Sequence, residues 1–405
     1  MYRDDYGELI TSLAIKNDRR ICLLVLDGLG DCANGKRGTG LQIAATPNLD
    51  RLAGEGACGL LTPVATAVTP GSGPGHLALF GYDPLVYTVG RGVLSALGLE
   101  FPLGPRDVAA RLNFCTLNAA GEVTDRRAGR ISDDENRRVL AKLREALKPP
   151  AGVEVFLETE SEHRALLVLR GDDLDDDVGD TDPQREGRAP LDPAAAPHHE
   201  SPTARMMADL LSQVRETLAD EKRANMVLSR GAAKYPDWPR FPERFRLNPA
   251  AVAGYPMYRG VARLVGMETV SAPQTASEVT AAAAAALATH DFVFAHFKYT
   301  DKAGEDGDLD AKVAHIEEMD AALPALLEAR PDVLVITGDH STPPSMSAHS
   351  WHPVPVLMLA PALRGGQPPR FDEITCRTGE IGTIPAKEML PLAMAHAGKL
   401  EKFGA

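Results

Sequence analysis

The sequence lacks the features of several common protein classes. Its 405 residues contain only five cysteines, an odd number, and none are spaced as Cys-x-x-Cys, which argues against a disulfide framework or a zinc ribbon. Lysine and arginine (43) are outnumbered by aspartate and glutamate (56), and the net charge of −13 argues against a nucleic-acid or anionic-membrane partner. No apolar run reaches the roughly 18 residues that cross a bilayer, and the first residues have no signal-peptide core. These absences predict a protein of the reducing cytoplasm.

Nucleotide-binding and hydrolase fingerprints are also missing. The turn after the apolar run 21–26 does not have the GxGxxG pattern of dinucleotide-binding turns, and neither the Walker A loop nor the GxSxG turn of serine hydrolases occurs in the sequence. The length predicts two to three domains at about 150 residues per domain. Apolar runs and helical stretches alternate up to about residue 86 and again from about residue 250. The region between them differs in its residue pattern, which predicts a separate domain.

Acidic and histidine side chains follow two of the apolar runs. Asp27 comes directly after the run 21–26, and Asp339 and His340 come just after the run 332–337. Such continuous runs are typical of buried parallel strands, and in open α/β sheets ligands bind at the carboxyl ends of the strands. A carboxylate beside an imidazole suits zinc or manganese. The simpler alternative is a surface turn rich in Asp, Ser and Pro.

Two further clusters lie beside other predicted strands. Asp301 and Glu305 follow an apolar run that ends at Phe297, and His349 and His352 precede another apolar run. Each cluster alone has an ordinary explanation, such as a helix cap or a surface charge. Together with the first two they are better explained as a two-metal phosphoryl-transfer site.

One serine stands out in a loop of glycine and proline. Ser72 lies within residues 70–75, just before a predicted helix that begins at His76, whose free N–H groups would favour an anion near the serine. A plain Gly/Pro-rich loop is the alternative. Because no GxSxG turn is present, activation of this serine by a metal is more natural than activation by a histidine base.

The middle region carries arginine clusters and an acidic loop. Residues 125–130 read Asp-Arg-Arg-Ala-Gly-Arg. Guanidinium groups bind carboxylates and phosphates in a bidentate manner, so these arginines are candidates for holding an anionic substrate. The acidic loop 171–187 is most simply a solvated surface.

At these residues the sequence resembles the cofactor-independent phosphoglycerate mutases of the archaeal-type branch, in the alkaline phosphatase superfamily. The resemblance implies an α/β fold: a phosphatase-like, metal-binding sheet domain with helices on both faces (1–86 and 250–405) and a smaller inserted α/β domain that binds substrate (87–249). The resemblance covers nearly the whole chain. The matching stretches are LVLDGLGD at 24–31, TPNLDRLA at 46–53, PGSGPGHLALFGYDP at 70–84, DRRAGRI at 125–131, TDKAGEDG at 300–307, TGDHSTP at 337–343 and AHSWHPVPV at 348–356.

The resemblance also assigns roles. Ser72 would be the nucleophile that becomes phosphoserine. One ion would be held by Asp27, Ser72, Asp339 and His340, and the other by Asp301, Glu305 and His349. The implied substrate-binding residues are Arg126, Arg130, Arg230, Asp180, Asp182 and Lys298.

This chain departs from the family pattern at two positions. The family has a D-x-x-G-H sequence where Glu305 stands here, and an oxygen ligand favours manganese or magnesium over zinc. His352 stands where the family more often has Asn or Asp; it is not expected to be a primary ligand, although it could substitute for one.

The implied activity is the interconversion of 3- and 2-phosphoglycerate through a phosphoserine. It would need two divalent ions (manganese first, with magnesium, cobalt or zinc as alternatives) and no 2,3-bisphosphoglycerate. The expected partner is a small phosphorylated metabolite, and a homo-oligomer is compatible with the sequence. Two alternatives stay open: a phosphotransferase or phosphatase acting on another small phosphorylated alcohol, such as a homoserine kinase-like enzyme, and a non-catalytic metal-binding protein.

Overall fold

The computed structural model describes residues 3–33, 35–194, 201–364 and 370–404. The chain divides into two compact units, the first formed by Met1–Thr88 with Trp238–Ala405 and the second by Val89–Asp237. In the part of the chain that is described, no helix is long and apolar enough to cross a membrane.

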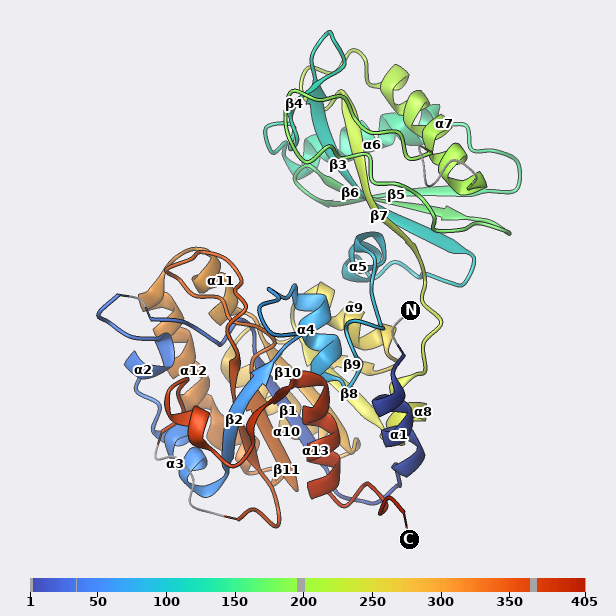
Figure 1. The fold of residues 1–405 in the computed structure, drawn as a ribbon. Coiled ribbons are helices and arrows are strands. Elements are labelled where there is room, and N and C mark those ends of the chain that lie inside the picture. The colour runs from blue at the N-terminus through green and yellow to red at the C-terminus, as the bar shows by residue number, and fades with distance from the viewer. Residues whose placement is uncertain (1–2, 34, 195–200, 365–369, 405) are drawn as a thin grey trace. The chain divides into compact units, whose positions relative to one another are not determined.

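The first unit is built on an eight-stranded sheet, several strands of which are labelled in Figure 1. The strand order is β13-β2-β12-β11-β1-β10-β8-β9. Its central strands β1, β10, β11 and β8 run parallel to one another, while β12 is antiparallel to both β11 and β2. The strands are β1 (Ile21–Leu26), β2 (Ala57–Thr62), β8 (Pro249–Ala253), β9 (Glu268–Ser271), β10 (Phe292–Phe297), β11 (Val333–Thr337), β12 (Val354–Leu359) and β13 (Gly382–Pro385).

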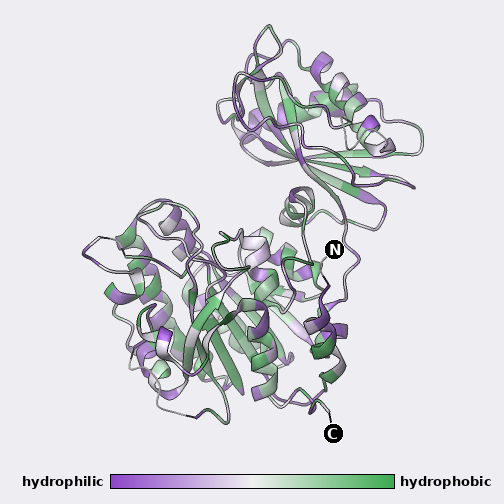
Figure 2. Ribbon diagram, viewed as in Figure 1, coloured by the Kyte–Doolittle hydropathy of each residue, from purple (hydrophilic) through white to green (hydrophobic). Residues whose placement is uncertain are grey.

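Helices cover both faces of this sheet. On one face, Leu24 and Leu26 of β1 share a core with Ile316 and Leu323 of a long helix. On the other face, the Phe294 ring of β10 packs edge-on against Phe80, with 4.9 Å between the ring centroids. Both faces are apolar because the central strands are continuous hydrophobic runs, which Figure 2 shows by colour. The predicted fold class is therefore confirmed for this unit.

The helices of the first unit are listed here with their bounds. They are α1 (Asp5–Leu13), α2 (Gly40–Ile43), α3 (Pro47–Glu55), α4 (Ser72–Leu79), α8 (Phe241–Phe245), α9 (Pro256–Leu264), α10 (Ala276–Ala286), α11 (Tyr299–Glu305), α12 (Leu309–Leu327) and α13 (Met389–His396), with the 3₁₀ turns η2 (Thr375–Thr378) and η3 (Ala386–Glu388).

Helix α4 begins earlier than the sequence predicted. The prediction placed its start at His76, whereas the helix begins at Ser72 after the N-cap Gly71. The first turn of a helix leaves its N–H groups without helical partners, so Pro74 fits there without loss of a hydrogen bond. Ser72 is thus the first residue of the helix instead of part of a preceding loop.

The second unit is an antiparallel sheet with helices. Its five strands have the order β4-β3-β6-β5, with β7 paired to the other edge of β3. Val108, Ala110 and Leu112 of β3 enter a core shared with Leu140 and Leu210 from two helices. The elements are α5 (Arg91–Gly98), β3 (Asp107–Leu117), β4 (Val123–Asp125), α6 (Asp133–Ala146), β5 (Glu154–Ser161), β6 (Arg164–Arg170), α7 (Pro202–Thr217) and β7 (Met226–Lys234).

Candidate active site

Strand register brings three distant segments of the first unit together. Leu26 at the end of β1 is paired with Phe297 at the end of β10, and Val25 is paired with Thr337 at the end of β11. The residues that follow these three parallel strands therefore emerge side by side at one edge of the sheet. This is where α/β sheets bind ligands.

Asp27, Asp339 and His340 form the first cluster at this edge. One ligand atom from each lies within 4.8 Å of the others, and all three side chains are buried. His340 Nε2 is 3.3 Å from Asp27 Oδ1 and 3.2 Å from Asp339 Oδ2. Ser72 Oγ lies 3.4 Å from the same nitrogen. The predicted serine and the first predicted ligand set thus converge on one point.

Asp301, His340 and His349 form the second cluster. His349 Nε2 is 3.6 Å from Asp301 Oδ1, and the His349 ring stacks on the His340 ring with 3.7 Å between centroids. Glu305 lies at the margin of this cluster: its Oε1 is 3.7 Å from His349 Nε2, and 53% of its side chain is exposed.

Thr342 sets the orientation of the His340 ring. Its hydroxyl donates to Asp301 Oδ1 at 2.6 Å and lies 3.0 Å from His340 Nδ1. A hydroxyl has one proton, so when Thr342 donates to Asp301 the remaining contact requires Nδ1–H to donate to the threonine oxygen. That tautomer leaves Nε2 with a free lone pair, the form in which histidine binds a metal.

The donor atoms of the first cluster fit a divalent cation. Both carboxylate oxygens of Asp27 and Oδ2 of Asp339 are buried, and none of them accepts a hydrogen bond of good geometry from the described residues. Their close neighbours are the Lys298 ammonium, 3.1 Å from Asp27 Oδ2, and His76 Nδ1, 3.1 Å from Asp339 Oδ2. Buried carboxylates whose hydrogen bonding is incomplete are costly, and a cation among them would reduce that cost. Two carboxylates, an imidazole and a hydroxyl form a donor set of the kind that manganese or zinc takes.

The surroundings of the first cluster set the protonation states of its side chains, and these states suit metal binding. Burial alone would raise the pKa of Asp27, but the Lys298 ammonium, followed by His296 and His340, holds this pKa well below its usual range. Burial holds the pKa of His340 well below normal, so its imidazole is neutral. Burial and then the charge of Asp27 raise the pKa of Asp339 to about 6. The cluster therefore combines an ionised carboxylate with a neutral imidazole.

Lys298 links the two clusters. Its ammonium is 3.1 Å from Asp27 Oδ2 and 2.5 Å from Asp301 Oδ2. Burial lowers the pKa of Lys298, but Asp27 and Asp301 raise it by more, so the side chain stays charged. This cation is a candidate donor to an anionic group bound beside the clusters.

His352 lies apart from both clusters. Its Nδ1 is 3.0 Å from Ser350 Oγ, and its ring stacks on the Trp351 ring. Among the described residues, neither of the two clusters that could hold a metal ion includes His352.

Sequence reasoning missed three residues that surround the first cluster. His76 Nδ1 lies 2.9 Å from the Ser72 carbonyl oxygen and 3.1 Å from Asp339 Oδ2. The Tyr258 ring lies 3.9 Å from the His296 ring, and the Tyr258 hydroxyl accepts a hydrogen bond from Lys298 at 3.2 Å. His296 is the one polar residue in an otherwise apolar strand, which is a signal that the sequence offered.

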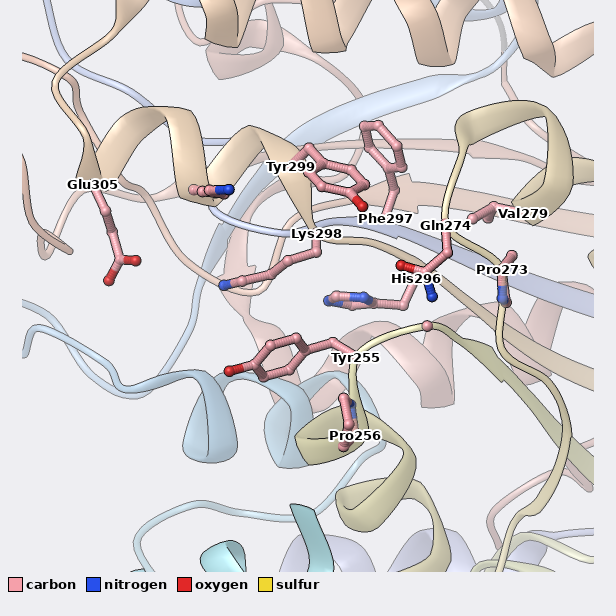
Figure 3. A pocket seen from close by; sticks show the side chains of 12 residues that line it. Tyr255, Pro256, Pro273, Gln274, Val279, His296, Phe297, Lys298, Tyr299 and Glu305 are labelled. Atoms are coloured by element: carbon pink, nitrogen blue, oxygen red, sulfur yellow. The ribbon is translucent and has the colours of Figure 1, made fainter. Parts of the chain in front are cut away.

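A cavity of about 530 Å³ opens beside the clusters. His296 and Lys298, which lie within 3.3 Å of Asp27, and Glu305, at the margin of the second cluster, line this cavity. Figure 3 shows Lys298 and Tyr255 projecting into it. Its remaining wall carries apolar and aromatic surface, including Phe297. A small anionic molecule therefore has room to reach Lys298.

The second unit has its own cavity, about 420 Å³, lined by cationic side chains. The three arginines predicted from the sequence all line it. The complete lining is Arg91, Arg111, Asn113, Arg126, Arg127, Arg130, His163, Arg164 and Arg230. Sequence reasoning missed Arg91, Arg111 and Arg164, because they are scattered along the chain and only the sheet brings them together.

Asp180 and Asp182 lie behind the arginines instead of lining the cavity. Asp182 accepts two hydrogen bonds from Arg126, at 2.9 and 2.7 Å, and lies 3.4 Å from Arg230 Nη1. Asp180 Oδ1 accepts from the Gly231 amide at 2.6 Å. Burial works against ionisation of Asp182, but Arg126 lowers its pKa, so it is a carboxylate that holds two guanidinium groups in place.

Comparison with known proteins gives one consistent result. A family model described as 2,3-bisphosphoglycerate-independent phosphoglycerate mutase matches residues 53–224. The chain is 50% identical over 405 residues to a probable 2,3-bisphosphoglycerate-independent phosphoglycerate mutase of Thermus thermophilus, covering 99% of this chain and 100% of the relative. A relative of the same description from Thermotoga maritima is 46% identical over 402 residues, again with 99% and 100% covered.

Two solved structures resemble the whole fold. A cofactor-independent phosphoglycerate mutase of Thermoplasma acidophilum has a TM-score of 0.73 and 32% identity, covering 94% of this chain and 100% of that one. A protein of Pyrococcus horikoshii has a TM-score of 0.80 and 29% identity, covering 96% and 99%.

Proposed function

The chain belongs to the family of 2,3-bisphosphoglycerate-independent phosphoglycerate mutases, and from this premise we propose that it interconverts 3-phosphoglycerate and 2-phosphoglycerate through a phosphoserine at Ser72. The observation that supports this most is the position of Ser72 Oγ, 3.4 Å from His340 Nε2 and at the first residue of α4. A serine at a helix N-terminus beside a carboxylate–imidazole cluster is suited to receiving a phosphoryl group.

We assign two divalent ions to the site, with manganese as the preferred metal. Asp27, Ser72, Asp339 and His340 would hold one ion, and Asp301, Glu305 and His349 the other. When bound, the ions would neutralise phosphate oxygens and lower the pKa of the serine hydroxyl.

The reaction needs two transfers of one phosphoryl group. Ser72 Oγ attacks the phosphorus, the bond from phosphorus to the 3-oxygen of glycerate breaks, and the proton of the serine passes to that oxygen. The 2-hydroxyl of the same glycerate then attacks the phosphoserine, its proton returns to Ser72, and 2-phosphoglycerate forms. No phosphoryl group is gained or lost over the cycle, so no bisphosphoglycerate is required.

Lys298 and the first turn of α4 are the proposed phosphoryl-binding groups of the first unit. The Lys298 ammonium lies between Asp27 and Asp301 and projects into the cavity beside them. The amide groups of the first helical turn have no helical acceptors, so they can donate to phosphoryl oxygens.

The second unit would hold the substrate through its arginine cavity. Arg126, Arg130 and Arg230 line a space that contains no acidic residue among its described lining residues, although Asp182 holds two of these arginines from behind. A phosphoglycerate carries a carboxylate and a phosphate, both of which pair with guanidinium groups in a bidentate manner.

The proposed function is tested by following 3-phosphoglycerate with phosphorus NMR, in the presence of manganese and without bisphosphoglycerate. Accumulation of 2-phosphoglycerate supports the proposal. Release of inorganic phosphate as the main product would replace the mutase with a phosphatase on the same fold, and a strict need for ATP would indicate a kinase.

Arg130→Ala is expected to weaken substrate binding. Arg130 lines the cavity, and its side chain has no acidic partner among the described ion pairs. Its removal therefore leaves no carboxylate without a cationic partner. Loss of one charged hydrogen-bonding group costs about 1.5–3 kcal/mol, which corresponds to a rise in KM of roughly ten- to a hundredfold. Steady-state kinetics with 3-phosphoglycerate as the varied substrate measure this change in KM.

The matched control for this variant is Arg138→Ala. Arg138 is in the same unit but does not line the cavity; it pairs with Glu221, and 54% of its own side chain is exposed. Glu221 keeps a second cationic partner in Lys142, at 3.5 Å. Because Arg138 lies outside the cavity, KM should stay within about twofold of wild type. Equal KM values for the two variants would contradict the assignment of the cavity.

Glu305→His is expected to change the metal preference. The substitution replaces an oxygen ligand with an imidazole at the margin of the second cluster, 3.7 Å from His349 Nε2. Imidazole suits zinc and cobalt better than a carboxylate does. The ratio of activity with zinc to activity with manganese should rise at least about tenfold, measured on metal-stripped protein reloaded with each ion. An unchanged ratio would place Glu305 outside the metal site.

A further inference from the structure

Lys312 of α12 is a fully buried ammonium that the proposed reaction does not use. It donates hydrogen bonds to the carbonyl oxygens of Gly28 at 2.9 Å, Gly30 at 3.0 Å and Thr342 at 2.9 Å. An ammonium has three donor protons, so all of them are used on backbone oxygens. The side chain therefore makes no direct contact with a proposed metal ligand.

The three carbonyls belong to the two loops that carry the first cluster. Gly28 follows Asp27, and Thr342 comes two residues after His340. The loops also bond to each other, from the Thr342 amide to the Gly30 carbonyl at 3.0 Å and from the Gly28 amide to Asp339 Oδ1 at 3.1 Å. Lys312 lies where these loops meet and fixes both of them to one helix.

The same helix is joined to the segment that carries the second cluster. α11, which includes Asp301, ends at Glu305, and α12 begins at Leu309. The packing is close, since a Cβ added at Gly304 would lie 2.3 Å from the Thr342 carbonyl oxygen. A shift of the loop at Thr342 would therefore affect both clusters.

Burial of this ammonium is costly, which makes a purely space-filling role a poor explanation. Removing a cation from water is unfavourable unless its hydrogen bonds are satisfied, and a methionine would fill the same space without that cost. Burial lowers the pKa of Lys312, while Asp31, Glu373 and Asp301 oppose this change. What the lysine adds over an apolar side chain is three directional bonds to two loops.

We propose that Lys312 is a positioning residue that holds the backbone on either side of Asp27 and His340 at the spacing a divalent ion requires. The proposal rests on the metal centre described above, and it assigns to Lys312 a share of the metal affinity. Groups that orient metal ligands from behind typically change affinity by about 10–100-fold when removed.

The test compares Lys312→Met with Lys399→Met. Lys399 is also fully buried and donates to a backbone carbonyl, that of Asn17 at 2.9 Å, and to Asp291 at 3.1 Å. Asp291 precedes β10, at the end of the strand opposite to Lys298, so Lys399 supports the fold away from the clusters. Both variants lose a buried ammonium, and only one of these ammonium groups touches the ligand-bearing loops.

Manganese binding is measured directly by electron paramagnetic resonance titration, and folding by circular dichroism. The dissociation constant for manganese should rise at least about tenfold in Lys312→Met and stay within about twofold in Lys399→Met, with both proteins folded at the temperature used. At saturating manganese the mutase rate of Lys312→Met should approach that of wild type. Wild-type manganese affinity in folded Lys312→Met, or equal losses in both variants, would overturn the proposal.

A variant that keeps part of the interaction covers the case in which Lys312→Met does not fold. Lys312→Gln retains an N–H donor on a shorter stem and should raise the dissociation constant by at least about threefold; unchanged affinity would overturn the proposal. Wild-type protein that binds no manganese would refute the metal centre and this proposal together. Wild-type protein that binds manganese but does not convert phosphoglycerate would refute only the function, and the comparison of variants would still decide on Lys312.

Discussion

Ser72→Ala is expected to abolish mutase turnover while leaving the fold intact, with a loss on the order of 10⁴-fold or more. The hydroxyl is the one group in the proposed cycle that forms a covalent bond to the phosphoryl group, so no neighbouring side chain can replace it. The change removes one oxygen at the first residue of α4, where Gly71 and not Ser72 is the N-cap. The helix therefore keeps its terminal hydrogen bonds.

The measurement combines turnover with detection of the intermediate. Wild-type protein incubated with phosphorus-labelled 3-phosphoglycerate and quenched in acid should carry label in the peptide that contains Ser72, because phosphoserine is stable to acid. Ser72→Ala should carry none, and its thermal unfolding should match that of wild type. Normal turnover in this variant would exclude the phosphoserine route even if the protein proves to be a mutase.

Removal of metal should be the second large effect. Chelator-treated protein is expected to lose mutase activity to below detection and to regain it on addition of manganese, with magnesium and cobalt less effective and zinc least. The physical reason is that Asp27 and Asp339 present buried carboxylate oxygens to the site, and these oxygens repel the oxygens of a phosphate unless a cation lies between them. These side chains and Ser72 cannot neutralise a phosphate by themselves.

The same cluster predicts a stability change that does not depend on activity. Manganese at about a hundred times its dissociation constant should stabilise the fold by about 2.7 kcal/mol, which calorimetry detects as a rise in unfolding temperature. Asp27→Asn should abolish this rise, because it removes the charge at the centre of the first cluster. The control Asp310→Asn changes an acidic side chain that is 80% exposed and should keep the rise. Mutase activity that persists in chelator would contradict the metal assignment.

The sequence alone predicted the main residues of the first unit for local reasons. Asp27 and Asp339 follow uninterrupted apolar runs, and a buried parallel strand has that signature wherever it lies in the chain. Ser72 was visible because glycine and proline isolate it. The start of α4 was placed four residues late, because proline in a first helical turn resembles proline in a loop.

The arginine cavity could be predicted only in part from the sequence. Arg126 and Arg130 lie in one motif, but Arg91, Arg111 and Arg164 line the same cavity from separate elements. Each of them reads as an ordinary surface charge in its own segment. Asp180 and Asp182 were expected to bind substrate, whereas they hold arginine and backbone groups, and a carboxylate beside a guanidinium looks the same in sequence in either role.

The sequence by itself determined which strands are buried, which residues stand at their ends, and that one serine is isolated among glycines and prolines. These properties depend on the hydrophobicity and backbone preferences of neighbouring residues. Only the tertiary structure decided that β1 lies between β10 and β11, so that Asp27, Lys298 and Asp339 meet, and that Lys312 reaches the backbone of two loops. Strand order and the direction of a buried side chain result from packing between segments far apart in the chain, and no single segment records them.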